Sequence, residues 1–461
     1  MKNMTLENIA KACNGIYVGD EDLKSKEITG VEKDSRLIED GYLYLPFVGA
    51  RVDGHDFIPQ VFDKGALCTL SEKDLDNLKG PYIKVESVAT ALKDIAEFYR
   101  KQLSCKIIGI TGSVGKTSTK EIIASVLKEK FKVLKTEGNY NNEIGEPLTI
   151  LKIRDEHEVA VIEMGISDFE EMHRLAKVSR PDVCVITNIG TCHLENLGDR
   201  DGVFKAKTEM FDHLQVDGTV ILNGDDDKLS TKKEVNGKPV IFYGVGADSA
   251  FDIKKDIYAT DIENHGLEGM CAKIHTPQGD FDAKIPIPGE HNVYNALAGT
   301  AVGLQLGLSI REIAQGIASV QTIAGRTNLL HVKGMTVIDD CYNANPVSMK
   351  ASIDVLAHTS GRRIAVLGDM GELGAEEKEL HRSIGKAVAA SGIDALFCAG
   401  TLAEEYASEA KANPECEVHY KKTREEMTEE LLAYVKEGDT VLVKASHFME
   451  FPKVVEALTK E

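Results

Sequence analysis

Residues 109–121 read "GITGSVGKTSTKE". The apolar run "CKIIGI" (105–110) leads into this stretch, and "IIASVLKEK" (122–130), which has the apolar spacing of a helix, follows it. A strand, a glycine-rich turn that holds one lysine, and a helix together form a phosphate-binding unit. The stretch therefore predicts an α/β sheet that binds phosphate, and the rest of the chain must indicate which phosphate.

The glycine loop departs from the usual pattern G-x-x-x-x-G-K-[ST], because isoleucine stands at position 110, where the first glycine would fall. Gly112 and Gly115 still allow backbone N–H groups to turn towards an anion at the positive end of the helix dipole. Lys116 can neutralise β- and γ-phosphate oxygens, and one of the two hydroxyls after it can bind Mg²⁺. The alternative is a glycine-rich turn that only caps a helix. The expected nucleotide-binding residues of the loop are Gly112, Ser113, Gly115, Lys116, Thr117 and Ser118.

Length and composition indicate a water-soluble protein of about three domains. The chain has 461 residues, of which 43% are hydrophobic and 28% are charged. It has no long apolar run and no secretory signal, so we expect a cytoplasmic protein that does not insert into membranes. Its nine cysteines include no C-x-x-C pair, which argues against a zinc knuckle. A net charge of −20 argues against nucleic-acid binding but allows a nucleotide ligand.

The order of the expected elements indicates an α/β protein with three domains. Residues 1–86 have mixed elements, including a strand over 42–48 and a helix near 55–64. Within 87–322, strands alternate with helices, which predicts a mostly parallel sheet. Short alternating strands between 240 and 288 predict an antiparallel insert in that domain. A second alternating set predicts another open α/β sheet over 323–461.

Polar residues gather in an asparagine-rich stretch and at the end of one strand. The stretch "TEGNYNNEIGEP" contains Asn139, Asn141 and Asn142, and it is either a simple loop or a loop whose amides orient a polar substrate. Glu163 ends the apolar strand "VAVIE". A strand-end carboxylate beside a phosphate loop is well placed for Mg²⁺, although such a residue is often only a cap or an ion-pair partner.

The loop after the next strand, "VITNIGTCHLENLG", carries His193. A lone histidine is usually structural, but carboxyl ends of parallel strands share one sheet edge, so His193 and Glu163 can converge on a metal. Lys207 follows in "KAKTEMF". From the residues alone it is an exposed helical lysine, and Lys205 is equally available.

Eight motifs, taken in order, resemble the Mur ligase family: "TGSVGKTS", "NNEIGEP", "VIEMG", "TNIGTCHLENLG", "AKTEMF", "PGEHNVYNALA", "AGR" and "DDCYNANP". The resemblance covers most of the chain. It implies a small α/β domain for the UDP end of the substrate, a central P-loop ATPase domain and a C-terminal Rossmann-like domain. Three stretches favour the branch that joins D-alanyl-D-alanine to UDP-N-acetylmuramoyl-tripeptide: "DSRLIEDGYLYLPFVGARVDGHDFI", "IDDCYNANPVSM" and "AVLGDMGELG".

Two other interpretations stay open beside that branch. One is a sister ligase that adds a single amino acid, and the other is a nucleotide switch without ligase activity. Folate polyglutamate ligases share the ATP machinery but generally lack an N-terminal domain of this kind.

The resemblance implies that ATP phosphorylates the terminal carboxylate of the tripeptide and that the dipeptide amine then attacks the acyl phosphate. It implies Lys116, His193 and Lys207 as catalytic residues. Two Mg²⁺ ions are expected, one held by Thr117 or Ser118 with Glu163, and a second to which His193 contributes. Lys207 resembles the family's carbamoylated lysine, which must first lose a proton although a free lysine has a pKa of about 10.4.

The resemblance also assigns residues to the nucleotide and to the other substrates. Asn292 and Asn295 would read adenine, unless they form only a polar stripe on a helix. Arg326 would reach the ATP phosphates and Asp340 the ribose. His55 and Asp56 are weaker candidates for the UDP end, since Asp56 could simply cap a helix. The expected substrate residues are Ser35, Arg36, Asn139, Asn142, Tyr342, Asn343 and Asn345. We expect a monomer.

Overall fold

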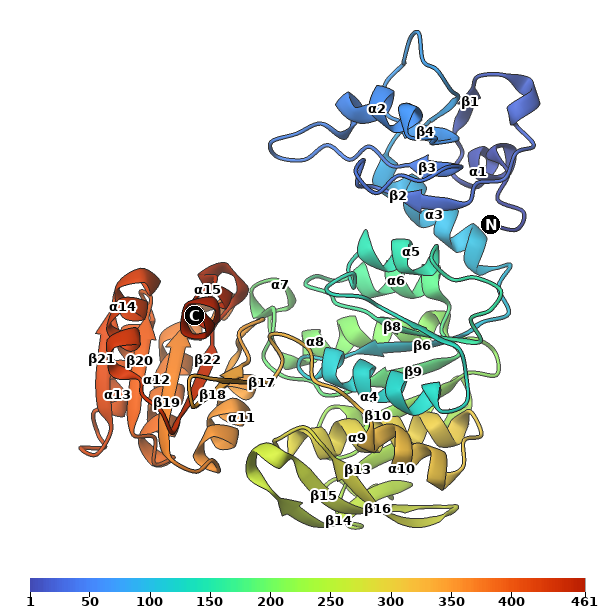
Figure 1. Ribbon diagram of the computed structural model, residues 1–461. Helices are drawn as coiled ribbons and strands as arrows, with labels where there is room; N and C mark the ends of the chain where they lie inside the picture. The colour runs from blue at the N-terminus through green and yellow to red at the C-terminus, as the bar shows by residue number, and fades with distance from the viewer. Residues whose placement is uncertain (461) are drawn as a thin grey trace.

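The computed structural model describes residues 1–460 and shows three α/β domains, each built around its own sheet (Figure 1). The N-terminal domain stands on the central domain, and the C-terminal domain lies beside the central one. No helix in residues 1–460 is both long and apolar enough to cross a membrane. The three domains with their own sheets confirm the predicted α/β fold class.

The N-terminal domain has a five-stranded sheet in the order β1-β5-β4-β3-β2, in which only β1 is antiparallel. Its strands are β1 (Ile16–Val18), β2 (Gly30–Glu32), β3 (Tyr42–Tyr44), β4 (Cys68–Ser71) and β5 (Tyr82–Lys84). Its helices are α1 (Leu6–Ala12), η1 (Glu21–Leu23), η2 (Gly54–Phe57) and α2 (Ile58–Asp63). The strand expected over 42–48 stops before Pro46, because proline cannot donate to a β ladder. The helix expected near 55–64 begins as η2, and Asp53 caps its start by accepting a hydrogen bond from the backbone N–H of His55. Asp56, the cap considered from the sequence, lies inside the first turn.

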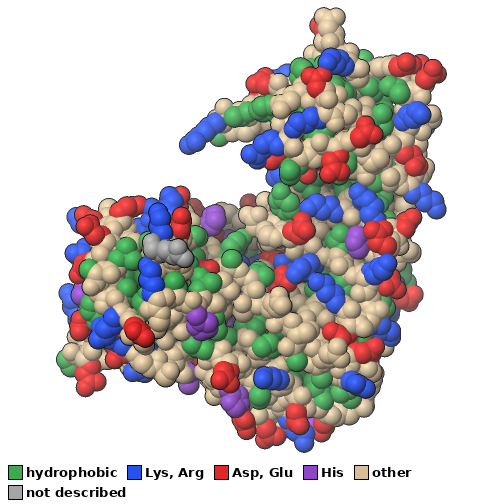
Figure 2. All heavy atoms as spheres, viewed as in Figure 1, with side chains coloured by type: hydrophobic (Ala, Val, Ile, Leu, Met, Phe, Trp, Pro, Cys, Tyr) green, Lys and Arg blue, Asp and Glu red, His purple; other side chains and the backbone are tan. Residues whose placement is uncertain are grey.

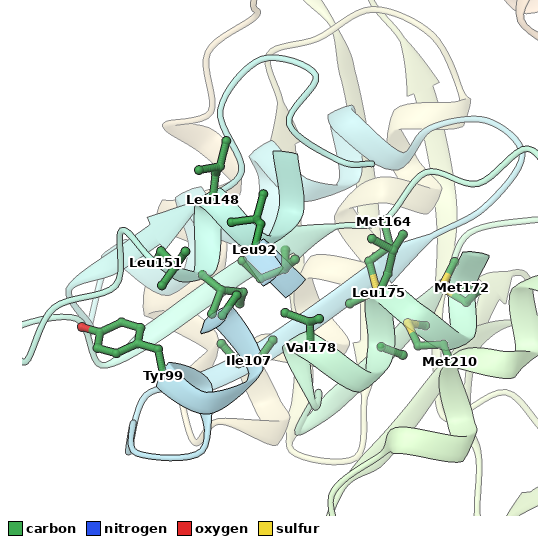
Figure 3. Packing of buried hydrophobic residues seen from close by; sticks show 14 of the residues in the cluster. Leu92, Tyr99, Ile107, Leu148, Leu151, Met164, Met172, Leu175, Val178 and Met210 are labelled. Atoms are coloured by element: carbon green, nitrogen blue, oxygen red, sulfur yellow. The ribbon is translucent and has the colours of Figure 1, made fainter. Parts of the chain in front are cut away.

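Helix α3 (Val88–Arg100) joins the first two domains, because it packs on α1 and also on α5 (Gly145–Ile150) and α6 (Glu171–Ser179) of the central domain. Figure 3 shows Leu92 and Tyr99 of α3 beside Leu148 and Leu151 of the α5 segment. The Tyr99 hydroxyl donates to the Ile153 carbonyl at 2.6 Å. One hydrophobic cluster therefore runs from the N-terminal domain into the central domain.

The central sheet has nine strands in the order β16-β15-β14-β13-β10-β9-β6-β8-β7. These strands are β6 (Lys106–Thr111), β7 (Val133–Lys135), β8 (Val159–Glu163), β9 (Val183–Ile186), β10 (Thr219–Asn223), β13 (Ile241–Val245), β14 (Ile257–Asn264), β15 (Met270–Thr276) and β16 (Gly279–Ile285). A separate small hairpin pairs β11 (Glu234–Val235) with β12 (Lys238–Pro239). The strands from β7 to β14 are parallel, and β14, β15 and β16 are antiparallel. The strands of the expected antiparallel insert thus continue the central sheet. Their residues Ala259, Ala272 and Ile274 belong to the same hydrophobic core as the helices that cover this sheet.

Helices cover both faces of this sheet. α4, α9 and α10 pack together on one face, whereas α5 and α6 pack with α3 on the other. The helices are α4 (Lys116–Lys128), α5 (Gly145–Ile150), α6 (Glu171–Ser179), α7 (Leu194–Leu197), α8 (Arg200–Thr208), η3 (Glu209–His213), η4 (Leu229–Thr231), η5 (Gly266–Glu268), α9 (His291–Gln305) and α10 (Ile310–Ala318).

The C-terminal sheet has the order β17-β18-β22-β19-β20-β21, and every pair is parallel except β17 with β18. Its strands are β17 (Asn328–Val332), β18 (Met335–Asp339), β19 (Arg362–Gly368), β20 (Ala395–Ala399), β21 (Glu417–Lys421) and β22 (Asp439–Lys444). Its helices are α11 (Pro346–Ala357), η6 (Gly374–Glu376), α12 (Glu377–Ala390), α13 (Ala403–Ala410), α14 (Arg424–Tyr434), η7 (His447–Met449) and α15 (Pro452–Thr459). Strand β17 was not predicted from the sequence. The Lys333-Gly334 turn joins β17 to β18, and both of its residues have the positive φ that a two-residue hairpin requires.

Candidate active site

A cavity of about 780 Å³ lies between the central and C-terminal domains. Its central-domain wall comes from the loops after β6, β8, β9 and β10, which all end at one edge of the sheet. The structure brings together around this cavity many of the residues predicted from the sequence: Ser113, Gly115, Lys116, Thr117, Ser118, Asn142, Glu163, His193, Asn295, Arg326, Asp340, Tyr342, Asn343 and Asn345.

The glycine loop starts α4 and is held by the loop after β9. Gly115 is the N-cap of α4 with φ +81°, and Gly112 has φ +151°. A Cβ on Gly112 would lie 1.9 Å from the Thr187 hydroxyl, so this glycine is required by packing as well as by conformation. The Thr187 hydroxyl donates to the Val114 carbonyl at 2.6 Å, and the Lys116 ammonium donates to the Gly112 carbonyl at 2.9 Å. The loop therefore has a fixed shape, with its lysine folded over it.

The Glu163 carboxylate lies beside this loop and is 2% exposed. Its Oε1 accepts hydrogen bonds from the Thr117 hydroxyl at 3.2 Å and from Asn141 Nδ2 at 2.8 Å. Its Oε2 is buried without a hydrogen-bond partner in residues 1–460. A buried carboxylate oxygen without a donor, next to a hydroxyl, fits a divalent cation that prefers oxygen ligands. Asn141 belongs to this site but was not among the predicted site residues, although it stands in the asparagine-rich stretch.

His193 is paired with the C-terminal domain. It precedes α7 with φ +54°, and its Nδ1 lies 2.7 Å from Oε2 of Glu372. The hydrogen bond from His193 lowers the pKa of the Glu372 carboxyl. In the part of the chain that the structure describes, no three His, Cys, Asp or Glu side chains form a ready metal-binding group. The structure therefore brings His193 to the cavity wall but does not join it to Glu163.

Lys207 is 1% exposed in α8 and does not line the cavity. Burial lowers the pKa of its ammonium to about 8; the Cys192 thiol opposes this shift and the Lys116 ammonium adds to it. Lys205, the rival, points away, with its ammonium 5.6 Å from the centre of the Phe169 ring. Of these two lysines, only Lys207 is buried, and burial favours the neutral form of its amine.

The two helix α9 amides differ in their position. Asn295 lines the cavity, whereas Asn292 is 1% exposed and does not. Asn292 Nδ2 donates to the Pro288 carbonyl, its Oδ1 accepts from Asn295, and Asn295 Oδ1 accepts from the Thr119 hydroxyl, each at 2.8 Å. The Asn292 amide is thus hydrogen-bonded within the protein, and of the two amides Asn295 is the one at the cavity.

The opposite wall comes from the C-terminal domain. The Arg326 guanidinium lies 4.1 Å from the centre of the Tyr342 ring, and its NH2 is 3.5 Å from the Thr117 hydroxyl of the central domain. Asp340 accepts from Lys444 Nζ at 2.6 Å and from the Ser352 hydroxyl at 2.5 Å. Lys444 lines the cavity and was missed, since it lies more than a hundred residues from its partner.

Two of the remaining predicted residues serve local structure. The Asn345 side chain caps α11 by accepting from the Ser348 N–H at 2.9 Å. Asn142 Oδ1 accepts from the Gly145 N–H at 2.9 Å and so holds the start of α5. Asn139 is exposed and does not line the cavity.

The candidates for the UDP end lie in the N-terminal domain and do not line the cavity. Ser35 is nearly buried, and its carbonyl accepts from Lys64 at 2.8 Å. The exposed Arg36 pairs with Asp34 at 2.6 Å, and this hydrogen bond lowers the pKa of Asp34 to about 2. His55 is held by Asp53 at 2.6 Å, which indicates a structural role. Figure 2 shows the N-terminal domain overhanging the C-terminal domain across an open space, with several basic side chains on the overhang.

Family models match most of the chain. "Mur ligase family, catalytic domain" matches residues 27–100, "Mur ligase middle domain" matches 110–303, and "Mur ligase, glutamate ligase domain" matches 325–447.

Curated relatives and solved structures agree with these matches. The UDP-N-acetylmuramoyl-tripeptide–D-alanyl-D-alanine ligase of Bacillus subtilis is 36% identical, and that of Escherichia coli is 33% identical, each over 99% of both chains. A MurF crystal structure from Acinetobacter baumannii has a TM-score of 0.89 at 32% identity over 99% of both chains. The MurF ligase of Thermotoga maritima in complex with ADP has a TM-score of 0.80 at 30% identity, over 94% of this chain and 97% of that one. The chain belongs to the Mur ligase family.

Proposed function

We propose that this protein is an ATP-dependent ligase that joins D-alanyl-D-alanine to UDP-N-acetylmuramoyl-tripeptide. The observation that carries the proposal is the full-length similarity, above 30% identity, to ligases with that name. The product is the pentapeptide precursor of peptidoglycan, and ADP and phosphate are released.

The residues of the cavity suit this reaction. A carboxylate is a poor electrophile, so its oxygen first attacks the γ-phosphorus of ATP, which gives an acyl phosphate and ADP. The dipeptide amine then attacks the acyl carbon, the amine loses a proton, and phosphate leaves. Phosphoryl transfer depends mainly on placement and on charge neutralisation. The Lys116 ammonium and the N-terminus of α4 provide positive charge for the phosphates, and Arg326 adds a third positive group from the facing domain.

Two groups of residues would hold Mg²⁺. Thr117 or Ser118 with Glu163 would hold one ion, which fits the Glu163 oxygen that has no hydrogen-bond donor in residues 1–460. His193 and a carbamoylated Lys207 would serve the second. When bound, Mg²⁺ neutralises phosphate oxygens during the transfer.

Carbamoylation of Lys207 requires a neutral amine that attacks CO₂, forms an N–C bond and releases a proton. The buried position and the lowered pKa of Lys207 support this modification. We expect Lys207→Ala to be nearly inactive and to recover activity with short carboxylic acids, which can replace the carbamate. Full activity without added acid would exclude the role, and Lys205→Ala is the matched control.

Each of the three domains would bind a different part of the substrates. Residues 1–86 would bind the UDP end through Ser35 and Arg36, 87–322 would bind ATP, and 323–461 would complete the ATP site with Arg326 and Asp340. Tyr342, Asn343, Asn345 and Asn142 line the cavity where the reacting groups would meet. One chain supplies the whole cavity, so we propose a monomer, and we expect it in the cytoplasm, where ATP is available.

The deciding experiment measures phosphate release from ATP in the presence of UDP-N-acetylmuramoyl-tripeptide. We expect release only with D-alanyl-D-alanine, together with a new amide product by mass spectrometry. Release with a single amino acid would identify a sister ligase instead. Release that ignores the amine would overturn the ligase proposal.

A further inference from the structure

A lysine with no part in the proposed mechanism is buried beside the phosphate loop. Lys120 stands one turn after Lys116 on α4 and is 1% exposed. Its ammonium donates to the Thr136 carbonyl at 2.8 Å. It lies 3.3 Å from Oε1 of Glu121 and 3.7 Å from Oε2 of Glu163. A buried ammonium is costly unless it is paired, so its position needs an explanation.

Lys120 contacts the Glu163 carboxylate directly and is linked to the Glu163 backbone through Thr136. The Thr136 hydroxyl accepts from the Glu163 backbone N–H at 3.0 Å, so the residue that binds the Lys120 ammonium also fixes the Glu163 backbone. The Glu163 oxygen near Lys120 is Oε2, the one without a hydrogen-bond donor in residues 1–460. Lys120 thus forms its ion-pair contact with the carboxylate oxygen that has no hydrogen bond in residues 1–460.

We propose that Lys120 is a positioning residue that balances the charge of Glu163, so that a divalent cation binds here only together with a nucleotide. The inference rests on the proposed use of Mg²⁺ and ATP. Glu121, which lies nearer to Lys120, is also paired with Lys135, so it does not cancel the charge of Lys120. With Lys120 beside Glu163 and Lys116 in the loop, the Thr117–Glu163 pair therefore offers a cation no net negative charge. The phosphates of a nucleotide supply that charge, so the cation and the nucleotide bind cooperatively.

A purely structural role is the alternative, in which Lys120 only ties α4 to the end of β7. The two roles differ in what the loss of the charge does to cation binding. Removal of a structural tie leaves the affinity of the nucleotide-free protein for a cation unchanged or weaker. Removal of a balancing charge makes this affinity stronger. A unit charge roughly 5 Å from a divalent cation changes the affinity by at least about tenfold, even at the dielectric constant of water.

The test measures Mn²⁺ binding to the full-length protein by electron paramagnetic resonance, with and without a non-hydrolysable ATP analogue. We expect wild type to bind Mn²⁺ weakly without the nucleotide. Lys120→Met should bind it at least about tenfold more tightly, and the effect of the nucleotide should shrink by the same factor. Lys120→Arg keeps the charge and Lys128→Met removes an exposed lysine from the same helix, so both should behave as wild type. Lys120→Met with Glu163→Gln should return to weak binding.

Equal or weaker Mn²⁺ binding by Lys120→Met than by wild type would overturn the proposal. A second measurement needs no variant: Mn²⁺ alone should leave the melting temperature of wild type unchanged, whereas Mn²⁺ with the analogue should raise it. A rise with Mn²⁺ alone would also overturn it. Neither assay contains a sugar peptide or an amine, so both report on Lys120 even if the ligation assay fails.

Discussion

His193 Nδ1 and Glu372 Oε2 lie 2.7 Å apart, although the two residues come from different domains. Both have left-handed backbones, with φ +54° for His193 and φ +60° for Glu372. Such conformations are uncommon outside glycine and are kept where the surroundings enforce them. The contact uses Nδ1, and Nε2 has no hydrogen-bond partner within residues 1–460, which is the arrangement in which a carboxylate orients a histidine ligand. The C-terminal domain thus helps to set the geometry of a central-domain residue.

Glu372→Ala should weaken the metal dependence of the reaction. Without the carboxylate, His193 loses the partner that fixes its ring, and such losses cost about 10- to 100-fold in metal affinity or activity. The measurement is the Mg²⁺ concentration for half-maximal ligation, which should rise about tenfold or more. Glu376→Ala, which removes another exposed glutamate nearby, is the control. An unchanged Mg²⁺ requirement would show that the pair is incidental.

Lys207 should make stability depend on pH and on CO₂. Its pKa is about 8 in the folded chain and 10.5 ordinarily. The unfolded chain binds the proton between these values, so stability rises with pH through this window and the ammonium penalises folding below pH 8. In CO₂-free buffer at pH 7, Lys207→Met should therefore raise the free energy of unfolding by about 3 kcal/mol.

The measurement for Lys207 is urea unfolding across pH 7 to 11. The difference between Lys207→Met and wild type should vanish towards the alkaline end. Added CO₂ should stabilise wild type and leave Lys207→Met unaffected, because only a lysine forms the carbamate. Lys205→Met should match wild type throughout. A wild-type stability that falls between pH 8 and 10.5 relative to Lys207→Met would contradict this account.

The sequence allowed the sheets to be predicted but not every pairing within them. Buried parallel strands read as continuous apolar runs between turn residues, so β6, β8, β9 and β10 could be recognised locally. Which strands pair at an edge depends on the whole fold, so the sequence predicted the antiparallel strands after 240 but not that they continue the central sheet. The β17 strand was missed because its turn, Lys333-Gly334, lacks the usual asparagine or aspartate.

The same division holds for the site. That Lys116, Thr117 and Glu163 line one cavity could be expected, because they follow or end strands of a parallel sheet, where ligands bind. The positions of Lys120 and Lys444 could not be expected, since each lysine pairs with a carboxylate distant in sequence. The spacing of Asn292 and Asn295 on one helix does not reveal which amide lines the cavity, and only Asn295 does.

Lys116→Ala should abolish ligation. No other ammonium in the glycine loop can neutralise the phosphates, and the loss of such a group costs about a thousandfold or more in rate. The measurement is amide product formation at saturating ATP. Lys128→Ala, at the exposed end of the same helix, should keep wild-type activity. Substantial turnover by Lys116→Ala would show that this lysine only closes the loop on the Gly112 carbonyl.

Asn141 and Asn139 should behave differently although they stand two residues apart. Asn141 Nδ2 donates to Glu163 at 2.8 Å, whereas Asn139 is exposed. Asn141→Ala removes one of the two hydrogen bonds to Glu163 Oε1, so we expect a loss of about tenfold in kcat/KM, from a hydrogen bond to a charged group. Asn139→Ala should match wild type. Equal effects of the two variants would mean that the stretch acts only as a loop.

Gly112→Ala should destabilise the protein more than any other alanine substitution in the loop. The new Cβ would lie 1.9 Å from the Thr187 hydroxyl, which itself holds the Val114 carbonyl, and φ is +151°. Overpacking with backbone strain costs about 3 kcal/mol or more. Gly138→Ala is the matched control, since Gly138 also has positive φ, +52°, but a methyl group there would meet nothing within 4 Å, so its cost is about 1 kcal/mol. Urea unfolding of both variants distinguishes the steric clash from the backbone strain. Equal losses in the free energy of unfolding would mean that Thr187 moves away from the new methyl group at little cost and that only the backbone conformation requires glycine at position 112.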